Sequence, residues 1–261
     1  MKDFTTVARE AALKAGGILR EHLNGNRTVS YKGDINLVTE MDICSERAVV
    51  ETLLASFPLH GIVAEEGTKI RNGSEFTWII DPLDGTTNYA HGYPCFSVSI
   101  ALEHQGELIL GVVYDPMRDE LFLAQKGQGA FLNGRPIRVS DTDTLIRSLL
   151  ATGFPYDRKI SQRNNLDYFH DLLMASQEVL RDGSAALDLC YVASGRFDGF
   201  WELKLKPWDV AAGSLIVREA GGTVSDFTGR PFSVQEEEIV ASNDKIHDQL
   251  VEILKKREHE I

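Results

Sequence analysis

Two aspartates follow a short apolar run in the first third of the chain. Asp81 and Asp84 lie in residues 78–88, where three apolar residues precede Asp81 and a proline stands between the two carboxylates. Because proline has no N–H group, it cannot continue a β-ladder, so the apolar strand is expected to end at Asp81. Two carboxylates across such a turn can converge on one hard cation, and Mg²⁺ prefers oxygen ligands. The segment therefore predicts a metal site at the end of a buried strand.

The residues around the second aspartate offer further groups for binding ions. Gly85, Thr86 and Thr87 could open a short helix whose free N–H groups would face an anion such as phosphate. The carbonyl of Leu83 could supply another oxygen to a cation. The alternative is that the two aspartates only cap a turn and a helix, as Asp-Pro and Asp-Gly pairs commonly do. The number of oxygen-bearing side chains after one buried strand favours the binding site.

Two more acidic segments occupy comparable positions. Glu65 and Glu66 follow another apolar run, and no basic residue occurs before Lys69. Adjacent carboxylates repel each other unless a cation compensates, although a solvated loop is the alternative. Asp209 follows Trp208 directly before an apolar helical pattern, where it could equally be an ordinary N-cap.

The overall composition limits the class of partner. The chain has 261 residues, and its net charge of −12 makes nucleic acid an unlikely partner, because phosphate contacts need Lys and Arg. The same charge repels a phosphorylated substrate unless metal ions intervene. No stretch approaches the length of a membrane span, the first residues lack a signal-peptide pattern, and the three cysteines have no metal-ligand spacing. We therefore expect a cytoplasmic protein that does not bind membranes.

Hydrophobic patterning predicts helices and strands in succession, which indicates a layered α/β or α+β architecture. Helices are predicted over residues 4–23, 41–57, 165–175, 185–193 and 210–220, and from Ser242 or Asn243 to Lys256. Strands are predicted over residues 62–64, 78–80, 96–102, 108–114, 120–124, 149–152, 223–225 and 239–241, with a hairpin turn at Asn133-Gly134. A polar stretch at 141–148 predicts two halves, residues 1–144 and 145–261.

These segments, in this order, resemble the inositol monophosphatase family over nearly the whole chain. Residues 78–88 are similar to that family's first signature, in which a strand ends in Asp-Pro-x-Asp-Gly-Thr, and residues 208–222 resemble its second signature. Glu65 and Glu66 stand where the family has a metal-binding glutamate pair. Asp42 lies in residues 37–42, which match the family's early motif.

The resemblance implies a layered αβαβα sandwich of the sugar-phosphatase type that binds two to three Mg²⁺ ions. The implied metal ligands are Glu65, Asp81, the carbonyl of Leu83, Asp84 and Asp209. Thr86 would lie beside the attacking water with Asp42 behind it, and Glu65 would help to orient that water. Gly85 and Thr86 would contact phosphate. Direct attack by water would require no phosphoenzyme.

The resemblance also implies which residues bind the polyol. These are Asp84, Gly183, Ser184, Ala185, Glu202 and Asp209, with Gly183–Ala185 forming a small-residue turn that lets a ring approach the backbone. The alternative for Glu202 is an exposed carboxylate at a strand end. Lys32 falls near the family's mobile-loop lysine, although the spacing is one residue short. A homodimer and inhibition by lithium are further implications.

The implied activity is hydrolysis of inositol 1-phosphate to inositol and phosphate. Related branches hydrolyse fructose 1,6-bisphosphate, histidinol phosphate, NADP or 3′-phosphoadenosine nucleotides, and these remain alternatives. A bisphosphate would need a basic pocket, for which the candidates are Arg158, Lys159, Arg163 and Arg181. A different class of function is also open, because some bacterial relatives act as protein partners of the transcription machinery.

Overall fold

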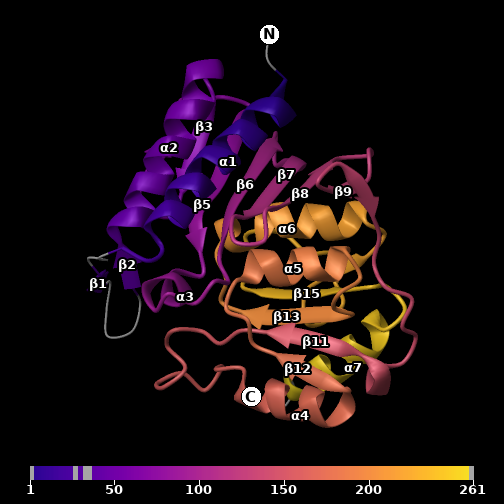
Figure 1. Cartoon of the computed structure of the whole chain (residues 1–261). Helices are drawn as coiled ribbons and strands as arrows, with labels where there is room; N and C mark the ends of the chain where they lie inside the picture. Colours follow the sequence, from indigo (N-terminus) through magenta and orange to yellow (C-terminus); the bar gives the residue numbers. More distant parts are fainter. Residues whose placement is uncertain (1–2, 26–28, 32–36, 259–261) are drawn as a thin grey trace.

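The computed structural model describes residues 3–25, 29–31 and 37–258 (Figure 1). Lys32 lies outside the described residues. Within the described residues, helices and sheets alternate in five layers, which confirms the predicted layered α/β architecture. None of the helices in this part of the chain is long and apolar enough to cross a membrane.

Two helices form the first layer. α1 (Phe4–His22) begins after Asp3, whose carboxylate accepts a hydrogen bond of 3.1 Å from the backbone of Thr6. α2 (Glu40–Ser56) begins at Thr39 with a capping box that Asp42 completes. It ends before the Phe57-Pro58 pair, because a proline disfavours helical backbone angles in the residue that precedes it.

The first sheet has eight strands in the order β10-β9-β8-β7-β6-β5-β3-β4. The strands are β3 (Gly61–Ala64), β4 (Lys69–Ile70), β5 (Phe76–Asp84), β6 (Ser97–His104), β7 (Glu107–Asp115), β8 (Glu120–Gln125), β9 (Ala130–Leu132) and β10 (Arg135–Ile137). β3 and β5 run parallel, and the other neighbours are antiparallel. The predicted turn at Asn133-Gly134 joins β9 and β10, with positive φ at both residues.

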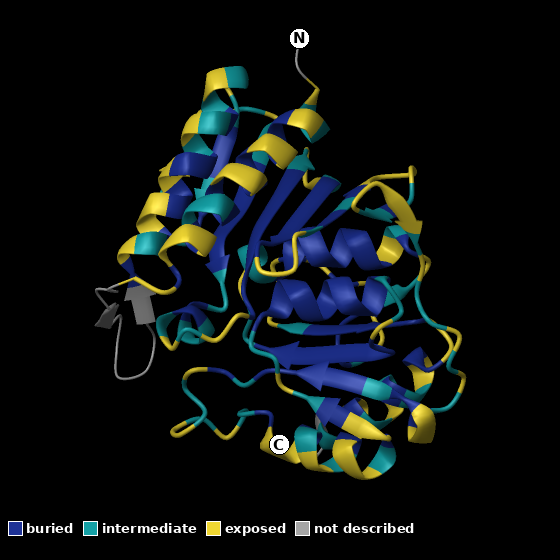
Figure 2. Cartoon of the chain, viewed as in Figure 1, coloured by how far each residue is buried: buried dark blue, intermediate teal, exposed yellow. Residues whose placement is uncertain are grey.

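Two helices fill the space between the sheets. Every residue of α5 (Ala185–Ala193) is buried, and α6 (Pro207–Glu219) is buried over most of its length, as the dark colour of both helices in Figure 2 shows. α6 packs against β6 and β7 of the first sheet and also contacts β14 and β15 of the second. A helix covered on both sides must be apolar all round, which explains the weak amphipathicity of these two segments.

The second sheet has five strands in the order β12-β11-β13-β15-β14. The strands are β11 (Leu149–Thr152), β12 (Glu178–Leu180), β13 (Gly199–Leu203), β14 (Thr223–Ser225) and β15 (Glu238–Ser242). β11 is parallel to β12 and β13, and β15 is antiparallel to β13 and β14. α4 (Leu166–Ala175) and α7 (His247–Glu258) cover its outer face, completing the layers (Figure 1). The remaining elements are β1 (Val29–Tyr31), β2 (Leu37–Thr39), the short helix α3 (Thr86–Ala90) and a single 3₁₀ turn at Leu145–Arg147.

The structure differs from the sequence prediction in the second sheet and at the last helix. β13 was not predicted, although it is the central strand of the second sheet. The last helix begins at His247 instead of following Ser242 or Asn243 directly, because Asp244 adopts a φ of 73° and turns the chain first. The proposed halves 1–144 and 145–261 remain a prediction. The two parts pack closely together, because α6 of the second half lies on the first sheet.

Candidate active site

A bulge at the end of β5 presents the two signature aspartates. The register between β5 and β6 shifts between Asp81 and Asp84, so that Pro82 stands outside the ladder and pairing resumes at Asp84. The strand therefore runs three residues beyond the expected end at Asp81. The carboxylate of Asp81 is buried and accepts a hydrogen bond of 3.0 Å from the backbone of Leu83, which fixes the turn.

A glycine redirects the chain after the bulge. Gly85 has a φ of 98°, which an L-side chain rarely adopts, and a Cβ here would lie 3.0 Å from the carbonyl oxygen of Cys95. α3 begins directly afterwards. The hydroxyl of Thr86 lies 3.0 Å from Asp42 Oδ1 and 3.0 Å from the carbonyl of Leu83. The helix start thus places Thr86 between α2 and the bulge.

Asp42 is held firmly at the start of α2. Its Oδ2 atom accepts hydrogen bonds from the backbone (2.7 Å) and the hydroxyl (2.6 Å) of Thr39, and its Oδ1 atom faces Thr86. Asp42 is fully buried, and this burial raises the pKa of its carboxyl, against the effect of its hydrogen bonds.

Asp209 both accepts a hydrogen bond from the backbone at the start of α6 and lies at the candidate site. It lies in the first turn of α6, where its carboxylate accepts a hydrogen bond of 2.7 Å from the backbone of Lys206. The N-cap is Lys206, so Asp209 is not the ordinary N-cap considered as the alternative; it is the third residue of the helix and accepts from the N-cap backbone. The same residue also borders the cavity described below, next to the aspartates of β5.

The acidic side chains strongly influence one another. Burial raises the pKa of Asp81 well above its ordinary value, and the nearby charges of Glu65, Asp84 and Asp209 raise it further. Burial also raises the pKa of Asp84 to about 6 and that of Asp209 to about 8. Partly desolvated carboxylates that repel each other are stabilised by a cation, so this donor set fits Mg²⁺. Within the described residues, no group of three or more His, Cys, Asp or Glu side chains is arranged so that it could hold a metal ion as it stands.

These segments border one cavity of about 490 Å³. The predicted site residues that line it are Glu65, Asp81, Leu83, Asp84, Gly85, Thr86, Gly183, Ser184, Ala185, Glu202 and Asp209. Asp42 lies behind Thr86 instead of on the wall. The structure thus brings together residues from both halves of the sequence, and their binding roles remain predictions.

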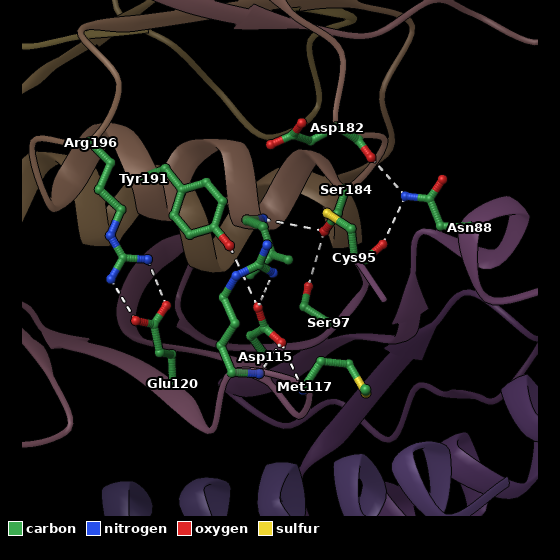
Figure 3. A network of polar contacts seen from close by, with 12 residues as sticks. Asn88, Cys95, Ser97, Asp115, Met117, Glu120, Asp182, Ser184, Tyr191 and Arg196 are labelled. Carbon is green, nitrogen blue, oxygen red and sulfur yellow. Dashed lines mark hydrogen bonds and ion pairs between the residues drawn. The ribbon is translucent and has the colours of Figure 1, made fainter. Parts of the chain in front are cut away.

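The small-residue turn before α5 is held against the signature segment. Ser184 Oγ donates to Asp84 Oδ2 (2.5 Å), and the backbone of Ala186 donates to the same oxygen (2.8 Å). The side-chain amide of Asn88 bridges the carbonyls of Cys95 (2.8 Å) and Asp182 (2.7 Å), as Figure 3 shows. The turn therefore depends on contacts with the first sheet and α3.

Glu202 is buried on β13 and is not the exposed strand-end carboxylate considered as an alternative. Its carboxylate packs so closely on Gly153 that a Cβ there would overlap it. Burial raises the pKa of Glu202 to about 8, against the opposing effect of Arg181. Glu202 thus lines the cavity in a position that a side chain at residue 153 would disturb.

Comparison with known proteins agrees with this geometry. The profile of the inositol monophosphatase family matches residues 1–259. The chain belongs to the inositol monophosphatase family. It is 44% identical over 252 residues to the Nus factor SuhB of Pseudomonas aeruginosa, covering 94% of this chain and 93% of that protein.

Solved structures of relatives share the fold. The inositol monophosphatase of Anabaena (Nostoc) sp. PCC 7120 superposes with a TM-score of 0.89 at 47% identity, over 97% of this chain and 95% of that one. The extragenic suppressor protein suhB of Bartonella henselae gives a TM-score of 0.90 at 42% identity, over 96% of this chain and 98% of that one. The layered arrangement is therefore that of the inositol monophosphatases.

The basic residues of this inositol monophosphatase-family chain are distributed unevenly around the cavity. Of the four candidates for a second phosphate site, only Arg181 lines it, while Arg163 forms an ion pair with Glu238. Lys204 and Lys206, which the sequence did not single out, also line the cavity. The ammonium of Lys204 is bound to Asp157 (2.6 Å). The cavity is thus lined by both basic and acidic side chains.

Asp188 is a further cavity residue that was not predicted from the sequence. This carboxyl lines the cavity, is almost completely buried, and its Oδ1 atom has no hydrogen-bond partner. Burial and the charges of Asp182 and Glu202 raise its pKa well above the ordinary value. Its position four residues after Ser184 on an apolar helix was the available signal, since that spacing places both on one face.

Proposed function

We propose that this chain hydrolyses the phosphate monoester of a small polyol, inositol 1-phosphate to inositol and phosphate, in a Mg²⁺-dependent reaction. The observation that carries the proposal is the meeting of Glu65, Asp81, Asp84 and Asp209 in one cavity that also exposes Thr86. Membership of the inositol monophosphatase family supports the same chemistry.

The proposed cofactor is two to three Mg²⁺ ions. Glu65, Asp81, the carbonyl of Leu83, Asp84 and Asp209 would hold them, and the ions would neutralise phosphate charge and activate water. Their removal would leave several carboxylates facing an anionic substrate, which would then be repelled.

Thr86 and Asp42 would orient and polarise the attacking water. The Thr86 hydroxyl has one proton, and donating it in the hydrogen bond to Asp42 (3.0 Å) leaves the lone pairs of Oγ1 available to accept a hydrogen bond from that water. Asp42 cannot turn away, because Thr39 occupies its other oxygen. Burial raises the pKa of Asp42, which makes it a better proton acceptor than an exposed carboxylate. Direct attack by water would make a covalent phosphoenzyme unnecessary.

Residues on β13 and in the turn before α5 would bind the polyol. Glu202 would accept hydrogen bonds from ring hydroxyls, and Gly183, Ser184 and Ala185 would let the ring approach the backbone. Gly85 and Thr86 would contact the phosphate. The phosphate would therefore lie at the carboxylate cluster and the ring near β13, and the cavity has lining residues from both sheets.

A related substrate is the second candidate. Arg181, Lys204 and Lys206 on the cavity wall favour a second anionic group, as in fructose 1,6-bisphosphate. A homodimer, inhibition by lithium and a cytoplasmic location are further proposals that rest on the family.

A candidate of another class is a partner protein of the transcription machinery with secondary phosphatase activity. The 44% identity to a protein named Nus factor SuhB supports it. Recovery of RNA polymerase with the purified chain at low salt would favour this candidate, and its absence would weaken it.

The deciding experiment is phosphate release from inositol 1-phosphate, fructose 1,6-bisphosphate, histidinol phosphate, glycerol 2-phosphate, NADP and 3′-phosphoadenosine 5′-phosphate, with and without Mg²⁺. Asp84→Asn is measured beside the wild type. Mg²⁺-dependent release from inositol 1-phosphate that falls more than about 100-fold in the variant would support the proposal. Preference for a bisphosphate would move the assignment to the second candidate. A folded, Mg²⁺-binding chain without activity on any substrate would refute the enzymatic function.

A further inference from the structure

One turn of α2 contacts three separate segments of the candidate site. Asp42, Ser45 and Glu46 lie at positions i, i+3 and i+4, which places them on one helix face. Asp42 faces Thr86, and the Ser45 hydroxyl donates to the carbonyl of Pro82 (2.6 Å). Glu46 contacts the turn that follows β3. A single helix face is thus hydrogen-bonded to three segments that lie next to predicted metal ligands in the sequence.

Glu46 makes the largest number of these contacts. Its Oε2 atom accepts a hydrogen bond of 2.7 Å from the backbone of Glu66. Its Oε1 atom accepts hydrogen bonds from the backbone (3.1 Å) and the hydroxyl (2.6 Å) of Thr68. Only 5% of Glu46 is exposed, so water cannot readily replace it as the acceptor for these donors.

The turn that Glu46 holds contains Glu65. The backbone of Ala64 donates to the carbonyl of Thr68 (3.0 Å) and closes the turn, and the backbone of Glu65 donates to the carbonyl of Ile80 (3.2 Å) on β5. The donors at Glu66 and Thr68 point instead toward α2. Hydrogen bonds to a carboxylate are stronger than those between neutral groups. Glu46 therefore fixes the backbone on the C-terminal side of Glu65.

We propose that Glu46 is a positioning residue that sets the place of Glu65 at the cavity and, through it, the affinity of the site for a divalent cation. The inference rests on the proposed function, in which Glu65 is a metal ligand. Groups that orient metal ligands typically contribute 10–100-fold to metal affinity. Glu46 makes these contacts from α2, whereas Glu65 lies in the turn after β3. The position of α2 is therefore coupled to the proposed metal site.

The test measures Mg²⁺ binding to the full chain by isothermal titration calorimetry without substrate, with circular dichroism as the check on folding. Glu46→Ala is expected to raise the dissociation constant for Mg²⁺ about 10–100-fold. The matched control is Glu51→Ala, an exposed position on the same helix, and it should bind like the wild type. A folded Glu46→Ala variant with wild-type affinity would overturn the proposal.

Two further variants separate positioning from packing. Glu46→Gln keeps the shape but turns an amide donor toward backbone donors, so its affinity should also fall; wild-type affinity here would show that Glu46 only fills space. Thr68→Val removes one hydroxyl contact and should weaken binding about fivefold, which tests the proposal even where Glu46→Ala does not fold. Unchanged affinity in Thr68→Val would count against it.

The readout also distinguishes the two proposals from each other. Weaker Mg²⁺ binding in the Glu46 variants, together with a wild type that hydrolyses none of the esters, would retain the inference and refute the enzymatic function. Hydrolysis by the wild type with unaltered binding in the variants would do the reverse. A wild type that binds no Mg²⁺ would refute both.

Discussion

Ser184 and Asp84 are joined by a hydrogen bond of 2.5 Å across the two halves of the chain, with the Ser184 hydroxyl donating to the Asp84 carboxylate. Asp84 ends β5 of the first sheet, whereas Ser184 is the N-cap of α5 in the layer between the sheets. The predicted metal ligand is therefore oriented by the same turn that would receive the polyol ring. If the proposed roles hold, metal binding and ring binding are expected to be coupled at this contact.

Replacing Ser184 tests this coupling. Ser184→Ala removes the N-cap and a hydrogen bond to a carboxylate, so the free energy of unfolding should fall by about 1–2 kcal/mol. Mg²⁺ affinity should fall with it, because Asp84 loses one of its orienting partners. Urea denaturation and a Mg²⁺ titration measure the two effects. Ser194→Ala at the other end of α5 is the control, and equal Mg²⁺ affinity in both variants would contradict the coupling.

Asp81→Asn should affect stability in opposite directions with and without metal. Burial and three neighbouring carboxylates raise the pKa of Asp81, so its charged form is disfavoured in the metal-free protein. The neutral amide keeps an acceptor for the backbone of Leu83 and should stabilise the metal-free chain by about 1–2 kcal/mol. With Mg²⁺ the wild type should become the more stable protein, because ion binding adds to its stability. Thermal melts in EDTA and in excess Mg²⁺ test the reversal; a variant less stable in both conditions would exclude it.

Gly153→Ala should impair substrate binding more than turnover. The added Cβ would overlap the carboxylate of Glu202 and displace it from the cavity. If Glu202 binds ring hydroxyls, KM should rise about tenfold while kcat changes little, because the ring loses a buried hydrogen-bond acceptor. Gly17→Ala is the control, since a Cβ at this helical position meets no atom within 4 Å. Unchanged kinetics in Gly153→Ala would argue against a role for Glu202 in substrate binding.

His247 should make the protein less stable in mild acid. Its ring lies between the hydroxyls of Ser225 (2.8 Å) and Ser242 (2.9 Å), and burial lowers its pKa from the ordinary value of 6.5. Below about pH 6.5 the unfolded chain binds a proton that the folded chain resists, so the free energy of unfolding decreases as the pH falls. Above that pH the group makes no such contribution.

The measurement compares urea denaturation at pH 8 and pH 5.5. His247→Gln should lose less stability between the two pH values than the wild type, whatever its stability at pH 8. His91→Gln, at an exposed position, is the control and should follow the wild type. An identical pH dependence in the wild type and His247→Gln would show that His247 does not contribute.

Short-range chemistry was readable from the sequence. The segment around Asp81 and Asp84 predicted a strand that ends in carboxylates, because an apolar run followed by Asp-Pro leaves few other conformations. Gly85, Thr86 and Thr87 predicted a short helix after the strand, and α3 begins at Thr86. The layered architecture followed from the order of helical and strand patterns. Each of these inferences depends on residues that are close in the sequence.

The tertiary structure alone decided which distant residues meet. Glu202 lies on β13, which the sequence analysis missed because its short aromatic-rich run also contains the carboxylate. Glu46 belongs to no recognisable sequence motif, and its proposed positioning role depends on the packing of α2 against the turn after β3. Asp188 looked like one polar residue in an apolar helix. Packing between layers determines such contacts, and it depends on pairs of residues as far apart in the sequence as Ser99 and Trp208, which no local pattern encodes.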